Sequence, residues 1–403
     1  MSLPKLFIGH MFNFNLQFAE MPVDQTRLLV EQGHRPLLDL LERHPRLKAD
    51  LFFTGVTDEY LRDHASDVIA RVKAGLGRGQ FGLGTYTYAH PVLSLIPFAD
   101  VVEQILLGLE ADEATWGIRP AGFLLPEVAW DVALPRAMEL AGLKWVAIYK
   151  EIVPKYAEAP DFPGSVLVQG AGGATVPAVL GHRVLGKQIQ AFLRGELGLP
   201  RLAKLIEELR QAGRPGRDQL LLVKQDAEVL YFTSIEYYRE KGRLRWGDPL
   251  PEVEAADRLD ELWSYLETLP EVEFTTIGSF LAGHPPAETV YAENISGHAG
   301  MDAWLRGEGR ERLNVLTDAA RQSLTAAEYA LRLAERLGLA TGEAKAVLRE
   351  GRRQLMLAEN SDGRAFVPHP TRKLAVATAA LEATRLAGEA LSLVPKRPTG
   401  EER

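Results

Sequence analysis

The amino-acid sequence predicts an α/β protein in which a parallel sheet, closed or nearly closed into a barrel, is followed by an α-helical bundle. Two observations support this fold class. Short apolar runs alternate with segments of helical period through the first part of the chain. From about Met301 the strand-like runs stop, and long amphipathic segments rich in Ala, Leu, Arg and Glu follow. We therefore expect a barrel domain over residues 1–290 and a helical bundle over residues 291–394.

The barrel region divides into repeated strand and helix units. The first strand is expected to end at His10, and a helix follows from about Gln25 to His44. Further strands are predicted at 49–53, 80–84, 122–125, 144–148, 219–224 and 273–276. Helices are predicted between them at 57–75, 98–116, 132–141, 198–212 and 254–268. Alternation of this kind predicts parallel strands covered by helices.

The regular alternation loosens near residues 154–190, which are rich in Gly and Pro and hold two short apolar runs. We expect an inserted strand pair or long loops there, in the position where barrel enzymes carry specificity. In the helical part, three helices are predicted at 323–337, 341–358 and 371–391. A polar connector runs from Glu359 to Pro370, and residues 395–403 are expected to form a disordered tail.

Composition excludes several classes of protein. The formal charge of −8 argues against nucleic acid as a partner, because phosphate binding needs clustered Lys and Arg. The absence of cysteine excludes disulfides, thiolate metal sites and a cysteine nucleophile. No signal-peptide pattern and no membrane-spanning apolar run are visible, so a cytoplasmic protein without membrane contact is expected. No cofactor is expected, and oligomerisation is left open.

Glu127 stands at the carboxyl end of the predicted strand Gly122 to Leu125, because Pro126 cannot donate to the sheet. In barrels this edge carries the chemistry, since the loops there converge on one cleft. A carboxylate followed three residues later by Trp130 suits a sugar site, with one group to attack and one flat face to stack. A structural interpretation stands beside it, in which Glu127 is an acid that caps the helix beginning near Val132.

Asp226 is a second acid at a strand end, about a hundred residues further along. Two carboxylates across a cleft are the minimal apparatus for cleaving a glycosidic bond. We expect the pKa of Asp226 to be raised by burial and by the neighbouring carboxylate. Glu228 follows two residues later, either as an acid that orients another group or as a substrate contact.

These motifs resemble those of glycoside hydrolase family 57. The segment Leu125 to Trp130 resembles its nucleophile region, and Gln225 to Glu228 resembles its acid/base region. Three weaker matches follow the family's order and are carried by His10, by Tyr88 to Pro97 and by Glu359 to Asp362. The resemblance implies a seven-stranded (β/α) barrel followed by a helical bundle, a retaining mechanism and substrates that are mostly α-glucans, and we expect α-1,4-linked glucans for this chain.

By the same resemblance, Glu127 is the expected nucleophile and Asp226 the expected general acid/base. The remaining candidates are expected to contact substrate, and they are His10, His90, Trp130, Glu228, Trp304 and Asp362. For the two histidines, a role as buried core residues is an equal alternative. For Trp304 and Asp362, which lie in the helical part, a place at the cleft is the less favoured reading.

Several departures from the family pattern keep other functions open. His10-Met11-Phe12 stands where the family has His-Gln-Pro, and Gln80 stands where it has a glutamate. One alternative is therefore a catalytically altered protein that binds carbohydrate or a partner protein, and another is an α-glycosidase of other specificity, such as an α-galactosidase. Related barrels hold a divalent ion with His-x-Asp motifs, which the segment after His10 does not supply, so no metal is expected.

Overall fold

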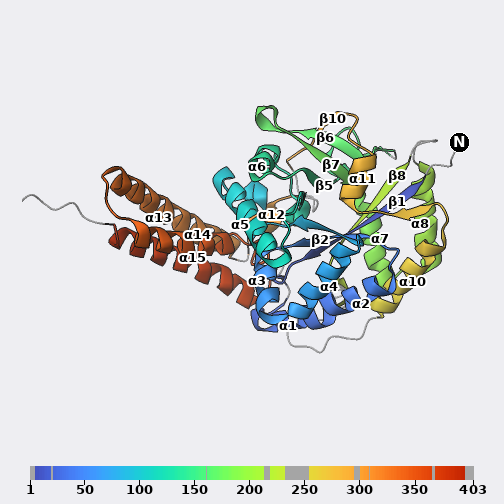
Figure 1. Cartoon of the computed structure of the whole chain (residues 1–403), viewed down its shortest axis with the longest axis horizontal. Helices are drawn as coiled ribbons and strands as arrows, with labels where there is room; N and C mark the ends of the chain where they lie inside the picture. Colours follow the sequence, from blue (N-terminus) through green and yellow to red (C-terminus); the bar gives the residue numbers. More distant parts are fainter. Residues whose placement is uncertain are drawn as a thin grey trace, which may run out of the picture. The chain divides into compact units, whose positions relative to one another are not determined.

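The computed structural model describes residues 5–19, 21–159, 161–212, 218–231, 254–294, 300–307, 309–364 and 368–394. The expected tail at residues 395–403 lies outside these residues. The chain forms two compact units (Figure 1). Unit 1 holds residues up to Phe18 and from Asp24 to Gly300, and unit 2 holds the segment Ala19–Val23 together with the chain from Met301 onward.

Unit 1 is built on a curled sheet whose main strands are parallel. These strands follow the order β7-β5-β4-β3-β2-β1-β8. Their bounds are β1 (Leu6–Phe14), β2 (Ala49–Phe53), β3 (Phe81–Thr85), β4 (Gly122–Leu124), β5 (Trp145–Tyr149), β7 (Thr175–Gly181) and β8 (Gln219–Asp226). Figure 1 shows helices covering this sheet. The predicted α/β barrel class is confirmed.

Three short strands extend this parallel set. In the expected insertion, β6 (Ser165–Gln169) pairs antiparallel with β7 and makes a hairpin. The strand β10 (Thr289–Tyr291) pairs with β6 at the sheet edge, and β9 (Val272–Phe274) pairs with β1. The insertion therefore contributes β7 to the barrel itself, because β7 pairs in parallel with β5.

The helices of unit 1 follow the strands in sequence. They are α1 (Thr26–Leu29), a π-helical turn (Val30–His34), α2 (Arg35–Arg43), α3 (Gly55–His64), α4 (Ser66–Gly77), α5 (Phe98–Trp116), α6 (Leu134–Ala141), α7 (Arg183–Leu193), α8 (Leu199–Ala212), α10 (Ala255–Thr268) and α11 (Ile277–Gly283). One helix expected over 57–75 is thus two. The first of them begins after Thr54, whose hydroxyl accepts the Thr57 N–H at 3.2 Å.

The barrel interior is a packed apolar core. Phe7, Met11, Phe52, Trp145 and Leu222 are buried there with side chains from α11. Side chains alternate along a strand, so Leu220, Leu222, Lys224 and Asp226 of β8 all point inward. The last two of them are polar and lie at the carboxyl end of the strand. The polar ends of the inward rows therefore collect at one edge of the sheet.

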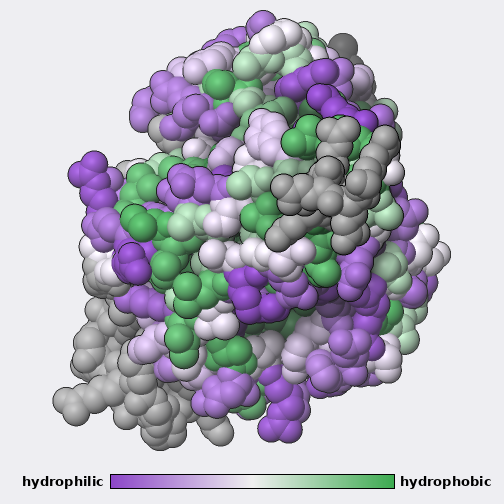
Figure 2. Space-filling view, turned by 90° about the vertical axis from the view of Figure 1, so that its left-hand side faces the viewer, coloured by the Kyte–Doolittle hydropathy of each residue, from purple (hydrophilic) through white to green (hydrophobic). Residues whose placement is uncertain are grey.

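Unit 2 contains three long helices. They are α13 (Arg310–Arg336), α14 (Gly342–Ala358) and α15 (Pro370–Ser392), preceded by the short α12 (Asp302–Leu305). Small and aliphatic residues such as Leu324, Leu355 and Ala383 are buried among them. Exposed apolar side chains also occur on these helices, including Tyr329 and Leu381. On the face drawn in Figure 2, hydrophobic side chains are interspersed among hydrophilic ones.

The short segment Ala19–Val23 belongs to unit 2 through backbone hydrogen bonds. The Ala19 carbonyl accepts the His369 N–H at 2.8 Å, and the Met21 carbonyl accepts Arg372 Nε at 2.9 Å. The Val23 N–H donates to Thr371 Oγ1 at 3.1 Å. The chain therefore leaves unit 1 after β1 and returns to it within a few residues. Among the helices that the structure describes, none is both long and apolar enough to cross a membrane.

Candidate active site

The candidate site is built from side chains at the carboxyl edge of the parallel strands of unit 1. Glu127 follows β4, and its side chain is 10% exposed. Asp226 ends β8, and its side chain is 23% exposed. Both carboxylates therefore reach solvent from different strands at the same edge, which is the position of reacting groups in barrel enzymes.

Two loops at this edge hold strained backbone. In the described part of the chain, the non-glycine residues with positive φ are Thr87 (69°), His90 (55°), Glu127 (54°) and Val128 (46°). Positive φ is a steric outlier for β-branched residues such as Thr87 and Val128. Such conformations cost about 1–3 kcal/mol each and cluster at functional sites. The loops after β3 and β4 are therefore held in a conformation that local sequence does not favour.

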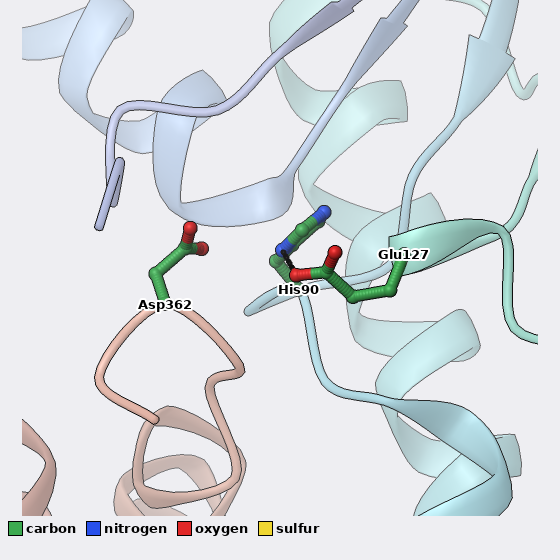
Figure 3. A group of neighbouring side chains, drawn as sticks. All are labelled: His90, Glu127 and Asp362. Atoms are coloured by element: carbon green, nitrogen blue, oxygen red, sulfur yellow. Dashed lines mark ion pairs between the residues drawn. The ribbon is translucent and has the colours of Figure 1, made fainter. Parts of the chain in front are cut away.

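His90 lies beside the candidate nucleophile. Its Nδ1 atom is 4.0 Å from Glu127 Oε1, and Figure 3 shows the two side chains with this ion pair. The His90 N–H donates to Thr87 Oγ1 at 3.2 Å, so the loop fixes its own geometry. The Tyr86 ring packs against the imidazole at a centroid distance of 4.7 Å. The loop after β3 therefore places an imidazole beside the Glu127 carboxylate.

Asp226 is held by two hydrogen-bond donors. Asn13 of β1 lies opposite Asp226 in the sheet, and its Nδ2 donates to Asp226 Oδ1 at 2.7 Å. Lys224 Nζ donates to the same oxygen at 3.2 Å. Burial alone raises the pKa of Asp226, but the Lys224 charge, the Asn13 amide and His90 outweigh it, so the pKa lies below its ordinary value. The expected raised pKa is therefore wrong, because a cation faces this carboxylate.

Further polar groups line the ends of β5 and β7. Burial lowers the pKa of Lys224, but Asp226 and the hydroxyls of Tyr86 and Tyr149 raise it more, so its pKa lies above the usual range. Next to this group, Glu151 Oε1 accepts the Arg183 N–H at 3.2 Å. These residues extend the polar edge beyond the two acids that the sequence singled out.

Glu228 occupies a buried place behind this edge. Its side chain is 0% exposed, and Oε1 accepts the Asn15 N–H at 3.0 Å and contacts His34 Nε2 at 2.7 Å. Burial raises the pKa of Glu228 against the opposing effect of His34. The carboxylate therefore ties the end of β8 to β1 and to the π-helical turn. These contacts fit the first of the two roles expected for Glu228, an acid that orients another group, and a substrate contact by Glu228 stays a prediction.

His10 does not lie at the edge. The strand β1 continues to Phe14, so His10 sits in mid-strand opposite Val223. It faces outward and packs against Trp263 of α10 at a centroid distance of 5.8 Å. Burial lowers the pKa of His10 to about 3. The expectation of a strand end at His10 was wrong because apolar residues continue the strand, and Asn13 takes the place at the edge.

Trp130 also lies in the core. It is 0% exposed and packs between the sheet and its covering helices with Phe123, Leu134 and Ile148. It presents no ring face to solvent, which contradicts a stacking role. The chain turns sharply at the positive φ angles of Glu127 and Val128, and the tryptophan then points into the helix layer.

Two remaining candidates belong to unit 2. Trp304 is on α12, and Asp362 is in the connector after α14, where Asn360 Nδ2 donates to Asp362 Oδ2 at 3.4 Å. The Arg364 guanidinium binds this connector through the Ala358 and Asn360 carbonyls, each at 2.8 Å. Substrate contacts by Trp304 and Asp362 stay predictions.

Sequence reasoning missed several residues of this edge. Lys224 had a signal, because a period of two along β8 places it on the same face as Asp226. Asn13 had none until the length of β1 was known. Tyr149 and Glu151 follow a correctly predicted strand, but nothing in their local sequence distinguishes them from ordinary loop residues.

A curled parallel sheet covered by helices defines a (β/α) barrel, and two carboxylates at the carboxyl edge are the kind of groups that a glycoside hydrolase uses. Comparison with known proteins agrees. The family model for glycosyl hydrolase family 57 matches residues 33–293. The chain therefore belongs to glycosyl hydrolase family 57.

Relatives of known sequence match a shorter stretch. An alpha-amylase of Pyrococcus abyssi is 30% identical over 118 residues, which is 29% of this chain and 18% of that enzyme. A 4-alpha-glucanotransferase of Thermococcus kodakarensis is 27% identical over 118 residues, again 29% of this chain and 18% of that enzyme. The match thus spans less than a fifth of the length of these relatives.

Solved structures agree in fold. The 4-alpha-glucanotransferase of Thermococcus litoralis aligns with a TM-score of 0.65 at 16% identity, over 95% of this chain and 60% of that one. The family 57 branching enzyme of Pyrococcus horikoshii aligns with a TM-score of 0.66 at 14% identity, over 96% of this chain and 87% of that one. At these identities the likeness shows the fold alone.

Proposed function

We propose that this chain is a retaining glycoside hydrolase or transglycosylase that acts on α-1,4-linked glucans. The observation that carries the proposal is the position of Glu127, on a strained loop at the same sheet edge as Asp226. The names of the sequence relatives, alpha-amylase and 4-alpha-glucanotransferase, support the same class of substrate. The cytoplasmic location expected from the sequence is part of this proposal.

In the first half of the reaction, Glu127 attacks the anomeric carbon, and the bond to the leaving oxygen breaks. Asp226 gives its proton to that oxygen. In the second half, Asp226 takes a proton from water or from an acceptor hydroxyl, whose oxygen attacks the anomeric carbon and releases Glu127. His90, with Nδ1 at 4.0 Å from Glu127 Oε1, lies beside the nucleophile and can orient its carboxylate.

The two acids can be separated by the stereochemistry of azide rescue. In Glu127→Ala the nucleophile is missing, so azide should displace the leaving group directly and give a glycosyl azide of inverted configuration. In Asp226→Ala the glycosyl-enzyme still forms from an aryl α-glucoside, so azide should give a product of retained configuration. Both variants should lose activity strongly. Glu127→Ala removes the covalent route, and Asp226→Ala removes general acid catalysis, which contributes about 10²–10⁴-fold.

The measurement is product analysis by NMR, with maltooligosaccharides, amylose and a panel of α-galactosides as further substrates. Glu113→Ala, an exposed acid of α5, is the matched control and should keep wild-type activity. If neither Glu127→Ala nor Asp226→Ala loses activity, or if both give the same anomer, the assignment of these residues fails.

A catalytically altered binding protein is the second candidate. The observation that favours it is the pair between Lys224 and Asp226, which holds the proposed acid in its ionised form. Calorimetric binding of maltooligosaccharides without turnover of any glucan or aryl glycoside would support this candidate. Turnover by the wild-type chain would exclude it.

A further inference from the structure

A lysine shares one strand and one face with the proposed acid/base. Lys224 and Asp226 are two residues apart on β8 and continue the inward row of Leu220 and Leu222. We propose that Lys224 is a positioning residue that keeps the proton off Asp226 and so favours substrates whose leaving oxygen departs without protonation. This inference rests on the proposed function, because it assumes the role given there to Asp226.

The geometry of the pair leaves one oxygen for proton transfer. Lys224 Nζ donates to Asp226 Oδ1 at 3.2 Å, and Asn13 Nδ2 donates to the same oxygen at 2.7 Å. Two donors on Oδ1 disfavour a proton there, because a protonated oxygen cannot accept both. The transferable proton therefore belongs on Oδ2. The pair lies at a partly buried edge, with side-chain exposures of 18% and 23%, so solvent screens it less than a surface pair.

The other groups around the pair do not replace the lysine. Within the described chain, the polar groups that act electrostatically on Lys224 or Asp226, or on their neighbour Tyr149, come from several elements. They are Asn13 on β1, Tyr86 and His90 after β3, Tyr149 and Glu151 at the end of β5, Arg183 on α7, and Glu228 after β8. Among the groups in this set, Lys224 is the one that brings an ammonium into hydrogen-bond distance of Asp226. The carboxylate of Glu228 is directed to His34 instead.

The chemical consequence differs between the two halves of the reaction. In the first half, Glu127 bonds to the anomeric carbon, and the leaving oxygen takes the electron pair of the broken bond. A phenolate can depart as an anion, whereas the alkoxide of a glucan chain needs the proton from Asp226 Oδ2. In the second half, ionised Asp226 is the form that accepts a proton from water or an acceptor hydroxyl. Lys224 therefore favours the second half and slows the first for unactivated glucans.

The test compares Lys224→Met, which removes the charge, with Lys224→Arg, which keeps it. The pH dependence of kcat/KM on maltooligosaccharides and the rates on aryl α-glucosides of graded phenol acidity are the readouts. In Lys224→Met the alkaline limb should move up by about 1–3 pH units, and the rate should depend less on the phenol. In Lys224→Arg the alkaline limb and the dependence of the rate on the phenol should stay close to those of wild type, because the positive charge is kept. Lys204→Met, on the exposed pair with Glu208 of α8, is the matched control and should change neither readout.

A second readout does not depend on activity. Carbon NMR of chains labelled at the aspartate carboxyl, with Asp226→Asn for assignment, follows the titration of Asp226 directly. An upward shift in Lys224→Met supports the inference, and an unchanged midpoint overturns it. If the midpoint shifts but no glycoside is turned over, the control of protonation stands and the proposed function fails. Lys224→Gln serves if the methionine variant does not fold.

Discussion

Buried carboxyl groups of unit 1 differ in charge state because their neighbours differ. Asp226 faces Lys224 and Asn13, and its pKa lies below the ordinary value. Asp50 is buried on β2, where its Oδ2 accepts the Ile277 N–H at 2.7 Å, and burial raises its pKa to about 7. The residue type alone thus does not decide the charge at neutral pH, because the partners in the fold do.

A pair of buried aspartates shows the same dependence of the pKa on neighbouring groups. Asp58 of α3 and Asp112 of α5 are neighbours, and both are 0% exposed. The two carboxyls act on each other as hydrogen-bond partners, and Trp116 beside Asp58 and Thr85 beside Asp112 act against the rise in pKa. Burial raises the pKa of Asp112 to about 7, and burial together with the charge of Asp112 raises the pKa of Asp58. One carboxyl of the pair therefore carries a proton over much of the acid range.

At the residue scale we predict that Asp112→Asn stabilises the protein as pH rises. The folded-state pKa of Asp112 is above the unfolded value of 3.8, so its contribution to stability is full below pH 3.8 and is lost as pH rises through about 7. Asparagine does not titrate and can donate to Asp58. Above pH 7 the variant should gain about 1–3 kcal/mol in free energy of unfolding.

The measurement for this variant is the melting temperature at pH 4 to 8, compared with wild type. Asp63→Asn, at an exposed position of α3, gives the background effect of replacing one solvent-exposed aspartate by asparagine. A difference between Asp112→Asn and wild type that stays flat with pH would contradict a shared proton between Asp58 and Asp112.

At the element scale, the three-residue strand β4 leads into the turn that holds Glu127. It pairs with β3 through Gly122 and Phe123 only, and with β5 through Gly122 to Leu124. Its first residue is glycine because the Trp145 ring of β5 covers that position. A Cβ atom added to Gly122 would come within 1.9 Å of Trp145 Cζ2. The close approach of this ring fixes where β4 lies in the barrel.

We predict that Gly122→Ala destabilises unit 1 by about 1–3 kcal/mol, since it overpacks the core against Trp145. Gly278→Ala on α11 is the matched control, because a Cβ there meets nothing within 4 Å. That control should be neutral or stabilise by up to about 1 kcal/mol through helix propensity. Urea unfolding curves measure both changes. Equal effects of the two substitutions would show that the Trp145 ring moves aside at no cost.

At the scale of the whole molecule, the two units are joined by more than one crossing of the chain. Residues 19–23 belong to unit 2 although they begin five residues after the end of β1. Removing residues 301–403 would therefore also strip these residues of their hydrogen bonds to the start of α15. A truncated chain is a poor test of what the helical unit does for activity, and a point substitution is sharper.

We predict that Arg372→Met loosens the segment 19–23. The substitution removes the hydrogen bond that Arg372 Nε donates to the Met21 carbonyl. This bond is 2.9 Å long and is buried. Loss of a charged hydrogen bond of this kind costs about 1.5–3 kcal/mol. Hydrogen exchange of the peptide over residues 19–23 should become faster, while β1 stays protected. Arg385→Met, on the exposed surface of α15, is the control and should leave the exchange unchanged.

The sequence by itself determined the fold class, because the spacing of apolar residues is set by secondary structure and needs no long-range information. It also placed Glu127 and Asp226 at strand ends, since Pro126 stops one strand and polar residues end the other. The helix Phe98–Trp116 was predicted over the same residues, because its apolar period and its terminal Gly117 are local signals.

The tertiary structure decided what surrounds those acids. Only the pairing of β1 with β8 brings Asn13 to Asp226, and only the packing of α10 and of the helix layer buries His10 and Trp130. The charge state of Asp226 depends on two donors. Lys224 lies two residues away on the same strand, whereas Asn13 comes from β1 and reaches Asp226 only through the register of the sheet. The period of apolar residues depends on residues that are close in sequence. Burial, strand register and pKa depend also on residues that only the folded structure brings close.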